Sequence, residues 1–140
     1  MAEKKLQLTI VTPEKMVVSE DVDQVNVPGV DGDLGVLYDH ASILSTLRPG
    51  QLSYETEREK GRETTHMVVS GGYLEVTDNR VIVLAETAEF LDQIDKARAE
   101  KARIKAEEAL ARADLSDEEF EKAQHKLFRA TARLENTLED

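Results

Sequence analysis

The sequence contains no cysteine and no tryptophan, and only 3 prolines among 140 residues. The absence of cysteine excludes disulfide bonds, thiolate zinc sites and cysteine nucleophiles, and it fits a reducing compartment. Long apolar runs are also missing, since no stretch approaches the ~20 apolar residues that a membrane-spanning helix needs. The first residues, Met-Ala-Glu-Lys-Lys, lead into a strand pattern without the apolar segment of a signal peptide. We therefore expect any membrane association to run through another protein.

Positive charge is scarce as well. The chain has 18 Lys and Arg against 29 Asp and Glu, which gives a formal net charge of −11. The acidic excess is spread along the chain, with 8 basic and 14 acidic residues up to Ala85 and 10 and 15 after it. No basic patch stands apart in the sequence, so we expect neither nucleic acid nor anionic lipid as a direct partner.

Glycine, proline and alanine divide the chain in two. All 7 glycines and 3 prolines precede Ala85, whereas 11 of the 14 alanines lie at or after Ala88. Before this division apolar residues alternate with polar ones, as in strands, and after it they recur at intervals of three and four, as in helices. The sequence therefore predicts an α+β protein, with a β-sandwich or flattened barrel over residues 1–86 and an antiparallel α-helical hairpin over residues 87–140.

Short strands separated by turn residues fill the first part. A glycine-rich segment at 28–41 has its glycines three apart and matches neither G-x-G-x-x-G nor G-x-x-x-x-G-K-[ST], so we interpret it as tight turns and not as a phosphate loop. The aliphatic residues expected in the core are Leu6, Leu8, Ile10, Val25, Val27, Val36, Leu44, Leu47, Val69, Leu74, Val76, Ile82 and Leu84.

The second part predicts two helices of similar length. Asp92 is the expected N-cap of the first, and an S-x-x-E capping box at 116–119 begins the second. Each helix carries an apolar seam at intervals of 3, 4, 3 and 4. The seams are Ala99, Ala102, Ala106, Ala109 and Ala113, and Phe120, Ala123, Leu127, Ala130 and Leu134, continued by Leu138. Because alanine buries little area, we expect a hairpin of marginal stability that a partner surface is able to extend.

No group of residues predicts catalysis or a metal site. The three histidines, His40, His66 and His125, fall on different elements, and we interpret them as structural or surface residues. Neither G-x-S-x-G nor H-E-x-x-H occurs.

Charged residues of the two helices are expected to lie together at one end of the hairpin. If the hairpin turns near residue 115, facing positions sum to about 230, which brings Arg129 and Arg133 to the end that carries Asp95 and Arg98. Arginine side chains suit phosphate oxygens, which would make this end an anion site. The simpler interpretation, which spacing alone favours, is a solvated face with i,i+4 ion pairs.

Several stretches in this order are similar to one known family. They are Pro-Gly-Val-Asp-Gly-Asp-Leu-Gly-Val-Leu-Tyr-Asp-His-Ala at 28–41, Leu-Arg-Pro-Gly at 47–50, Val-Ser-Gly-Gly-Tyr-Leu-Glu-Val at 69–76, Val-Ile-Val-Leu-Ala-Glu at 81–86 and Ile-Asp-Lys-Ala-Arg-Ala at 94–99. Nearly the whole chain resembles the epsilon subunits of the bacterial F-type ATP synthase, the counterparts of the mitochondrial delta subunit.

The resemblance implies a non-catalytic subunit of the central rotor stalk in an enzyme that makes ATP from ADP with a transmembrane proton gradient. It implies that the β domain binds the gamma subunit and the c-ring, and that the helical arm extends into the alpha and beta catalytic subunits to restrain ATP hydrolysis. No cofactor is required. The location implied is peripheral, at the cytoplasmic face of the bacterial inner membrane.

The resemblance also assigns residues. Some members bind ATP as a regulatory ligand on the folded hairpin, and the matching positions here are Glu89, Ile94, Asp95, Arg98, Ala99, Arg129 and Arg133. Asp33 stands where the family usually has a glutamate implicated in the c-ring contact. Tyr38 and Asp39 replace the usual Pro-Gly, and Ser42 replaces a common proline, which leaves the local turn geometry open.

An alternative from another class is a free-standing β-plus-coiled-coil scaffold or chaperone. Such a protein would be expected to carry longer leucine heptads and a presenting surface at the tips of its arm. The short alanine seam favours the stalk subunit, and co-purification with gamma and the catalytic subunits distinguishes the two.

Overall fold

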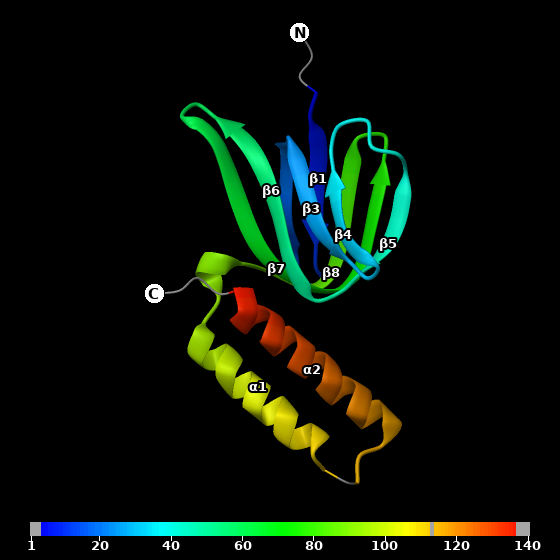
Figure 1. Cartoon of the computed structure of the whole chain (residues 1–140), viewed down its shortest axis with the longest axis vertical. Helices are drawn as coiled ribbons and strands as arrows, with labels where there is room; N and C mark the ends of the chain where they lie inside the picture. The colour runs from blue at the N-terminus through cyan, green and yellow to red at the C-terminus, as the bar shows by residue number, and fades with distance from the viewer. Residues whose placement is uncertain (1–3, 113, 137–140) are drawn as a thin grey trace. The chain divides into compact units, whose positions relative to one another are not determined.

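The computed structural model describes residues 4–112 and 114–136, and it divides into two compact units between Phe90 and Leu91 (Figure 1). The boundary expected at residue 86 falls inside a strand, because the last strand continues to Phe90. Ala88 and Phe90 at its end pack against the core of the first unit.

The first unit is a β-sandwich built from one folded sheet of eight strands. The strands are β1 (Leu6–Val11), β2 (Met16–Val22), β3 (Gln24–Gly29), β4 (Gly32–Val36), β5 (Ile43–Leu47), β6 (Gly50–Arg58), β7 (Gly61–Thr77) and β8 (Arg80–Phe90). Their order is β2-β1-β8-β7-β5-β3-β4, and β6 pairs with both β3 and β7. The pairing of β1 with β8 is parallel, and the other pairings are antiparallel.

Two long strands carry the sheet from one layer to the other. The first part of β7 pairs with β6 and the second part with β5. Between these parts lie Gly71 and Gly72, with φ of 47° and 134°. A Cβ atom on Gly72 would stand 1.8 Å from the carbonyl oxygen of Leu84 on β8. Glycine is therefore required where the paired strands bend.

The core between the layers contains ten of the thirteen aliphatic residues predicted for it. Leu44 and Leu84 are wrong predictions, since they are 72% and 50% exposed, and Ile82 is only half-buried. In β8 the inward positions are Val81, Val83 and Ala85. Because side chains of a strand alternate between faces, the residues between them point outward.

The second unit contains a 3-10 turn at Leu91–Gln93 and two helices, α1 (Lys96–Leu110) and α2 (Asp117–Asn136). They pack as the predicted antiparallel hairpin through buried Ala99, Ala106, Ala123 and Ala130. The seam residues Ala113 and Leu138 lie outside the described residues. Neither described helix has the length and apolar character of a membrane span.

Candidate functional site

The first helix of the hairpin begins at an aspartate. Asp95 is the N-cap of α1, and its Oδ1 accepts a hydrogen bond from the backbone nitrogen of Arg98 at 3.1 Å. This bond satisfies one of the amides left free at a helix start. The cap predicted at Asp92 is wrong, because that residue lies in the 3-10 turn before the helix.

The second helix begins at the predicted capping box, of which the structure shows the serine half. The backbone nitrogen of Glu119 donates to Ser116 Oγ at 3.1 Å, and Ser116 Oγ donates to Glu119 Oε1 at 3.2 Å. These bonds satisfy backbone amides at the first turns of both helices.

Between the helices lies a groove of about 450 Å³, called the hairpin groove below. Its lining residues are Ala102, Lys105, Ala106, Ala109, Arg112, Leu115, Glu119, Lys122, Ala123, Lys126, Arg129 and Arg133. Short alanines from both helices leave the space open, and six of the twelve lining residues are Lys or Arg against one carboxylate. A concave cluster of cations of this size suits a small, multiply charged anion.

The structure brings two of the predicted nucleotide residues into this groove. Arg129 and Arg133 are half-buried and line it from α2. Asp95 and Arg98 are exposed at the start of α1 and are not among its lining residues, while Ala99 is buried in the seam.

The other two predicted residues lie before the helix. Ile94 is half-buried and immediately precedes the cap of α1. Glu89 belongs to β8 of the first unit, where it pairs with Val68 of β7. The predicted nucleotide residues are therefore divided between the two units.

Sequence reasoning missed four cations of the groove, Lys105, Arg112, Lys122 and Lys126. The signal was present in the antiparallel arithmetic that placed the arginines. Positions 105 and 126, like 109 and 122, sum to 231, close to the expected facing sum. The same sum would therefore have placed Lys105 opposite Lys126.

Arg103 of α1 forms ion pairs within its own helix. Arg103 donates hydrogen bonds to the carboxylates of Glu100 and Glu107, the latter at 2.8 Å, and it does not line the groove. The hydrogen bond from Arg103 lowers the pKa of the exposed Glu100 carboxyl from its ordinary 4.5. On α1, therefore, Arg103 is paired with carboxylates of its own helix, whereas Lys105 lines the groove.

In the first unit, Arg48 fastens the predicted c-ring residue to the sheet. Its guanidinium donates from Nη1 to the Gly29 carbonyl at 2.5 Å and from Nη2 to the carboxylate of Asp33, which is itself 74% exposed. Two backbone bonds join the same segments, from Val30 to Thr46 at 2.9 Å and from Arg48 to Pro28 at 3.0 Å. The turn between β3 and β4 is therefore held in one conformation, with Asp33 presented to solvent.

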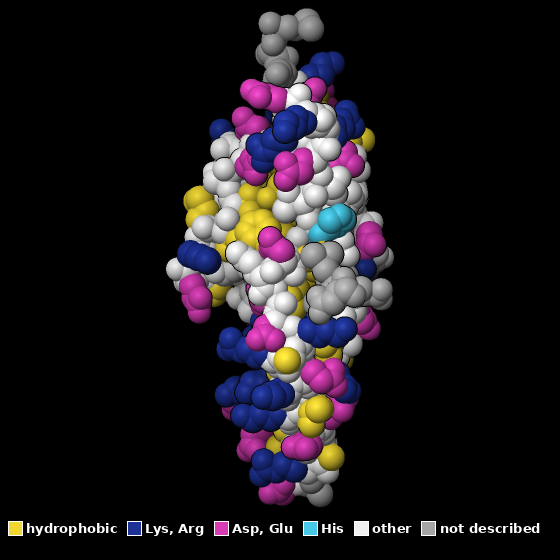
Figure 2. Space-filling model, turned by 90° about the vertical axis from the view of Figure 1, so that its left-hand side faces the viewer, with side chains coloured by type: hydrophobic (Ala, Val, Ile, Leu, Met, Phe, Trp, Pro, Cys, Tyr) yellow, Lys and Arg dark blue, Asp and Glu magenta, His cyan; other side chains and the backbone are white. Residues whose placement is uncertain are grey.

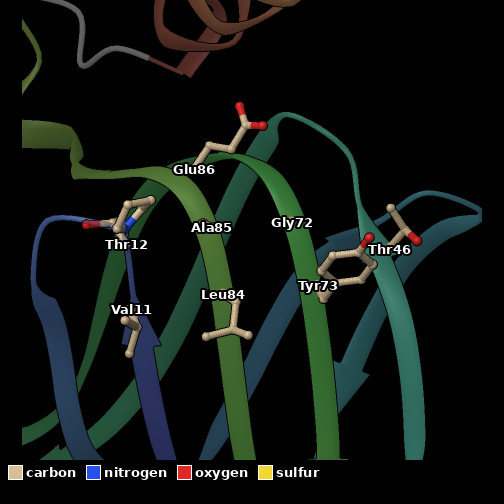
Figure 3. Close-up of a pocket in the computed structure, with 9 residues that line it drawn as sticks. Val11, Thr12, Thr46, Gly72, Tyr73, Leu84, Ala85 and Glu86 are labelled. Carbon is tan, nitrogen blue, oxygen red and sulfur yellow. The ribbon is translucent and has the colours of Figure 1, made fainter.

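The outward face of the sheet carries an apolar row across four strands. Register places Val11 beside Leu84, Leu84 beside Tyr73, and Tyr73 beside Thr46. Leu84 and Tyr73 stand on the same face of neighbouring strands, and Glu86 lies at the bend beyond them (Figure 3). These residues line a shallow hollow of about 470 Å³, called the sheet-face hollow below. An exposed apolar area of this kind is typical of a protein–protein contact.

The other described His, Asp and Glu side chains form no cluster that suggests a metal site. Among the described residues, no three His, Asp or Glu side chains are arranged to hold a metal ion. His40 contacts the Ala41 carbonyl, and His66 pairs with Gln51 across β6 and β7. These two histidines have local structural partners.

Both units match models of one family. Residues 5–91 match the β-sandwich domain of the ATP synthase delta/epsilon chain, and residues 92–135 match its long α-helix domain. The chain belongs to the ATP synthase delta/epsilon family. The two matches cover nearly all the described residues, and they confirm the resemblance drawn from the sequence motifs and the fold it implied.

Relatives in this family are similar over almost their whole length. The ATP synthase epsilon chain of Herpetosiphon aurantiacus is 45% identical over 130 residues, which are 93% of this chain and 92% of that protein. The epsilon chain of Nitratidesulfovibrio vulgaris is 47% identical over 132 residues, 94% of this chain and 95% of the relative.

Solved structures share the fold. A chain of the Euglena gracilis mitochondrial ATP synthase, in a structure of OSCP, F1 and the c-ring, has a TM-score of 0.75 at 23% identity. The match covers 93% of this chain and 79% of that one. A chain of the Tetrahymena thermophila enzyme, in a structure of the central stalk and c-ring, has a TM-score of 0.60 at 18% identity over 96% of both chains.

Proposed function

We propose that this chain is a non-catalytic subunit of the central stalk of an F-type ATP synthase. The observation that carries this proposal is the pair of family matches, which account for both units from residue 5 to residue 135. The subunit joins gamma to the c-ring, and its helical arm restrains ATP hydrolysis by the alpha and beta subunits. It is held peripherally at the cytoplasmic face of the membrane through the complex.

The first unit supplies the attachment surfaces in this proposal. Gamma docks on the sheet-face hollow, because Tyr73 and Leu84 expose 57% and 50% of their surface there. The c-ring contacts the turn between β3 and β4, where Arg48 presents the exposed Asp33. Both surfaces belong to the β-sandwich, so attachment does not require the arm.

Co-purification tests the attachment. A chain ending at residue 90 should still bind gamma, and Tyr73→Asp should weaken that binding by more than tenfold, because it buries a charge in an apolar contact. Thr64→Asp, at an exposed position on the same strand, is the matched control and should bind normally. A folded 1–90 chain that fails to bind gamma contradicts the proposal, as does equal loss in both variants.

The second unit regulates. Deleting residues 91–140 should leave assembly of the complex intact and raise its ATPase activity. The short alanine contacts between the helices support this role, since they let an inhibitory arm open at small cost. Unchanged ATPase activity over a range of ATP concentrations would show that the arm does not inhibit this enzyme.

The regulatory ligand in our proposal is ATP, bound to the folded hairpin. Arg129 and Arg133 hold its phosphates in the hairpin groove. The family pattern adds Glu89, Ile94, Asp95, Arg98 and Ala99. A ligand shifts a conformational equilibrium through its differential affinity for the two states, and at ~100 times its dissociation constant it contributes about 2.7 kcal/mol. ATP would therefore hold the arm folded, and its depletion would release the inhibitor.

Calorimetry on the whole subunit tests this ligand. ATP should bind at millimolar concentration or below, and Arg129→Ala should weaken binding by about tenfold, since it removes a charged phosphate donor from the groove. Arg98→Ala, outside the groove, should also weaken binding if the family pattern holds for this chain. Absence of binding in the wild type, or equal affinity in both variants and the wild type, would reduce these arginines to surface residues.

A further inference from the structure

The hairpin groove has more positive charge than the nucleotide proposal uses. Besides Arg129 and Arg133, it is lined by Lys105, Arg112, Lys122 and Lys126. Among the described residues, Glu119 is its one acidic lining residue. In a chain with a net charge of −11, this concentration of cations needs a physical explanation.

Local ion pairs explain only part of this charge. Lys122 lies 3.5 Å from Glu118, and Arg112 lies 3.7 Å from Asp114. These pairs are exposed and therefore weak. For Lys105, Lys126 and Arg129, the described part of the chain provides no carboxylate within ion-pair distance. Arg103, on the same helix as Lys105, has two.

The unpaired cations lie on both sides of the groove. Lys105 lines it from α1, whereas Lys126 and Arg129 line it from α2. Like charges gathered around one groove repel, and this repulsion opposes docking of the two helices. An anion with several charges, seated between the helices, would convert the repulsion into attraction. Dark blue Lys and Arg side chains also cluster along one flank of the helical unit in Figure 2.

The shape of the groove favours a thin, flexible anion. Alanines line it from both helices, and its volume of about 450 Å³ is that of a small-molecule site. From Lys122 to Arg133 the axis of α2 spans about 16 Å, at 1.5 Å per residue. A triphosphate therefore reaches only some of these cations, and a longer phosphate chain reaches more of them. Lysine and arginine are both effective phosphate ligands.

We propose that the hairpin groove binds a linear phosphate chain, inorganic tripolyphosphate or longer, without needing a nucleoside. Lys105, Lys122 and Lys126 extend the phosphate contacts of Arg129 and Arg133 toward the turn of the hairpin. The inference rests on the proposed nucleotide site for those two arginines and adds a ligand class to it. The bound chain stabilises the folded hairpin by bridging α1 and α2.

Titration calorimetry of the full chain with sodium tripolyphosphate, at fixed ionic strength and without magnesium, tests this inference. The wild type should bind at submillimolar concentration, and a longer polyphosphate should bind more tightly. Lys105→Gln and Lys126→Gln should each weaken binding about three- to tenfold, since each removes one phosphate contact. Lys101→Gln is the matched control on α1, exposed and outside the groove, and should bind as the wild type does. Far-UV circular dichroism checks that each variant keeps its helices.

Three results would overturn the inference: no heat with tripolyphosphate at millimolar concentration, an equal loss of affinity in Lys101→Gln, or tighter binding of an oligoglutamate peptide than of tripolyphosphate. ATP measured in parallel separates the two proposals. ATP binding without tripolyphosphate binding overturns this inference and leaves the nucleotide site standing. Tripolyphosphate binding without ATP binding supports this inference and contradicts the proposal that ATP is the regulatory ligand.

Discussion

The side chains that are buried inside the two units differ greatly in size. In the β-sandwich, large aliphatic residues such as Leu6, Leu8, Ile10 and Leu74 are fully buried. In the described hairpin, every buried residue is an alanine. Fully burying a Leu, Ile or Val side chain contributes about 1.5–3 kcal/mol, whereas an alanine methyl removes much less area from water. We therefore expect the β-sandwich to be stable by itself and the hairpin to have only marginal stability.

This difference has a functional consequence. A rotor attachment must keep its shape under load, which the deep core of the sandwich favours. The regulatory role that we propose for the arm requires it to change state for a few kcal/mol, which is the free energy that a bound ligand supplies at ~100 times its dissociation constant. The basic hairpin groove lies on the unit with the smaller buried side chains, where the free energy of the proposed ligand would have the larger effect.

The largest expected effect comes from separating the units. A chain of residues 1–90 should unfold in one cooperative transition, because it retains the whole aliphatic core. A peptide of residues 91–140 should show little persistent helix, because a hairpin joined by alanine contacts buries too little area to offset chain entropy. Far-UV circular dichroism with heating measures both.

The outcome that would contradict the comparison is a cooperatively folded isolated hairpin. A second contradiction would be a 1–90 chain that precipitates or lacks β structure. Adding tripolyphosphate to the hairpin peptide should raise its helix content if the groove binds phosphate chains, and leave the 1–90 chain unchanged.

Matched core substitutions give the next largest effect. Leu74→Ala should lower the free energy of unfolding of the β unit by about 2–5 kcal/mol, because it leaves a cavity among packed side chains. Ala106→Gly should cost the hairpin only about 1 kcal/mol, chiefly through helix propensity. Denaturant titration followed by hydrogen exchange assigns each loss to its unit. A larger loss from Ala106→Gly would show that the alanine seam contributes more than its area suggests.

The fold and the order of its elements could be predicted from the sequence. Alternating apolar residues indicate strands, and apolar residues at intervals of three and four indicate helices. Two of the three core predictions that differ from the structure depended on a feature that composition does not encode. Leu84 and Ile82 belong to a run of consecutive aliphatic residues on β8, and such a run does not show which alternate residues face the core. Only pairing with β7, bent at Gly71 and Gly72, places Leu84 outside.

The candidate site was predictable in part for the same kind of reason. Arg129 and Arg133 were found from helix spacing, and the structure places both in the hairpin groove. The missed lysines were not recognised because a charged residue on a helix is usually solvated. Their shared groove becomes visible only when both helices and their alanine lining are in place. Asp95 was expected as a phosphate neighbour, and the structure shows one of its oxygens accepting the capping hydrogen bond.

A smaller effect is expected at the turn that Arg48 holds. Arg48→Ala should speed amide exchange of Val30 several-fold while leaving global stability within about 1 kcal/mol, because an exposed ion pair contributes little to unfolding. Arg48→Lys should restore part of the protection, and Arg80→Ala, at an exposed site on β8, should have no effect on Val30. Equal exchange in Arg48→Ala and the wild type would show that the backbone bonds alone hold the turn.

The smallest expected effect is a difference in how the two units respond to pH. The hydrogen bond from Arg103 lowers the pKa of Glu100 in the hairpin, so its contribution to stability is present above the ordinary value of 4.5 and is lost as the pH falls below that value. Burial raises the pKa of Tyr54 in the sandwich above its ordinary 10.0, so its contribution is present below pH 10.0 and is lost at higher pH. Acid should therefore remove the contribution of Glu100 from the hairpin, and alkali that of Tyr54 from the sandwich. Helix ellipticity and tyrosine absorbance follow the two units separately. Arg103→Gln should flatten the acid response and Tyr54→Phe the alkaline one, and a variant that leaves its own pH response unchanged would remove that side chain as the cause.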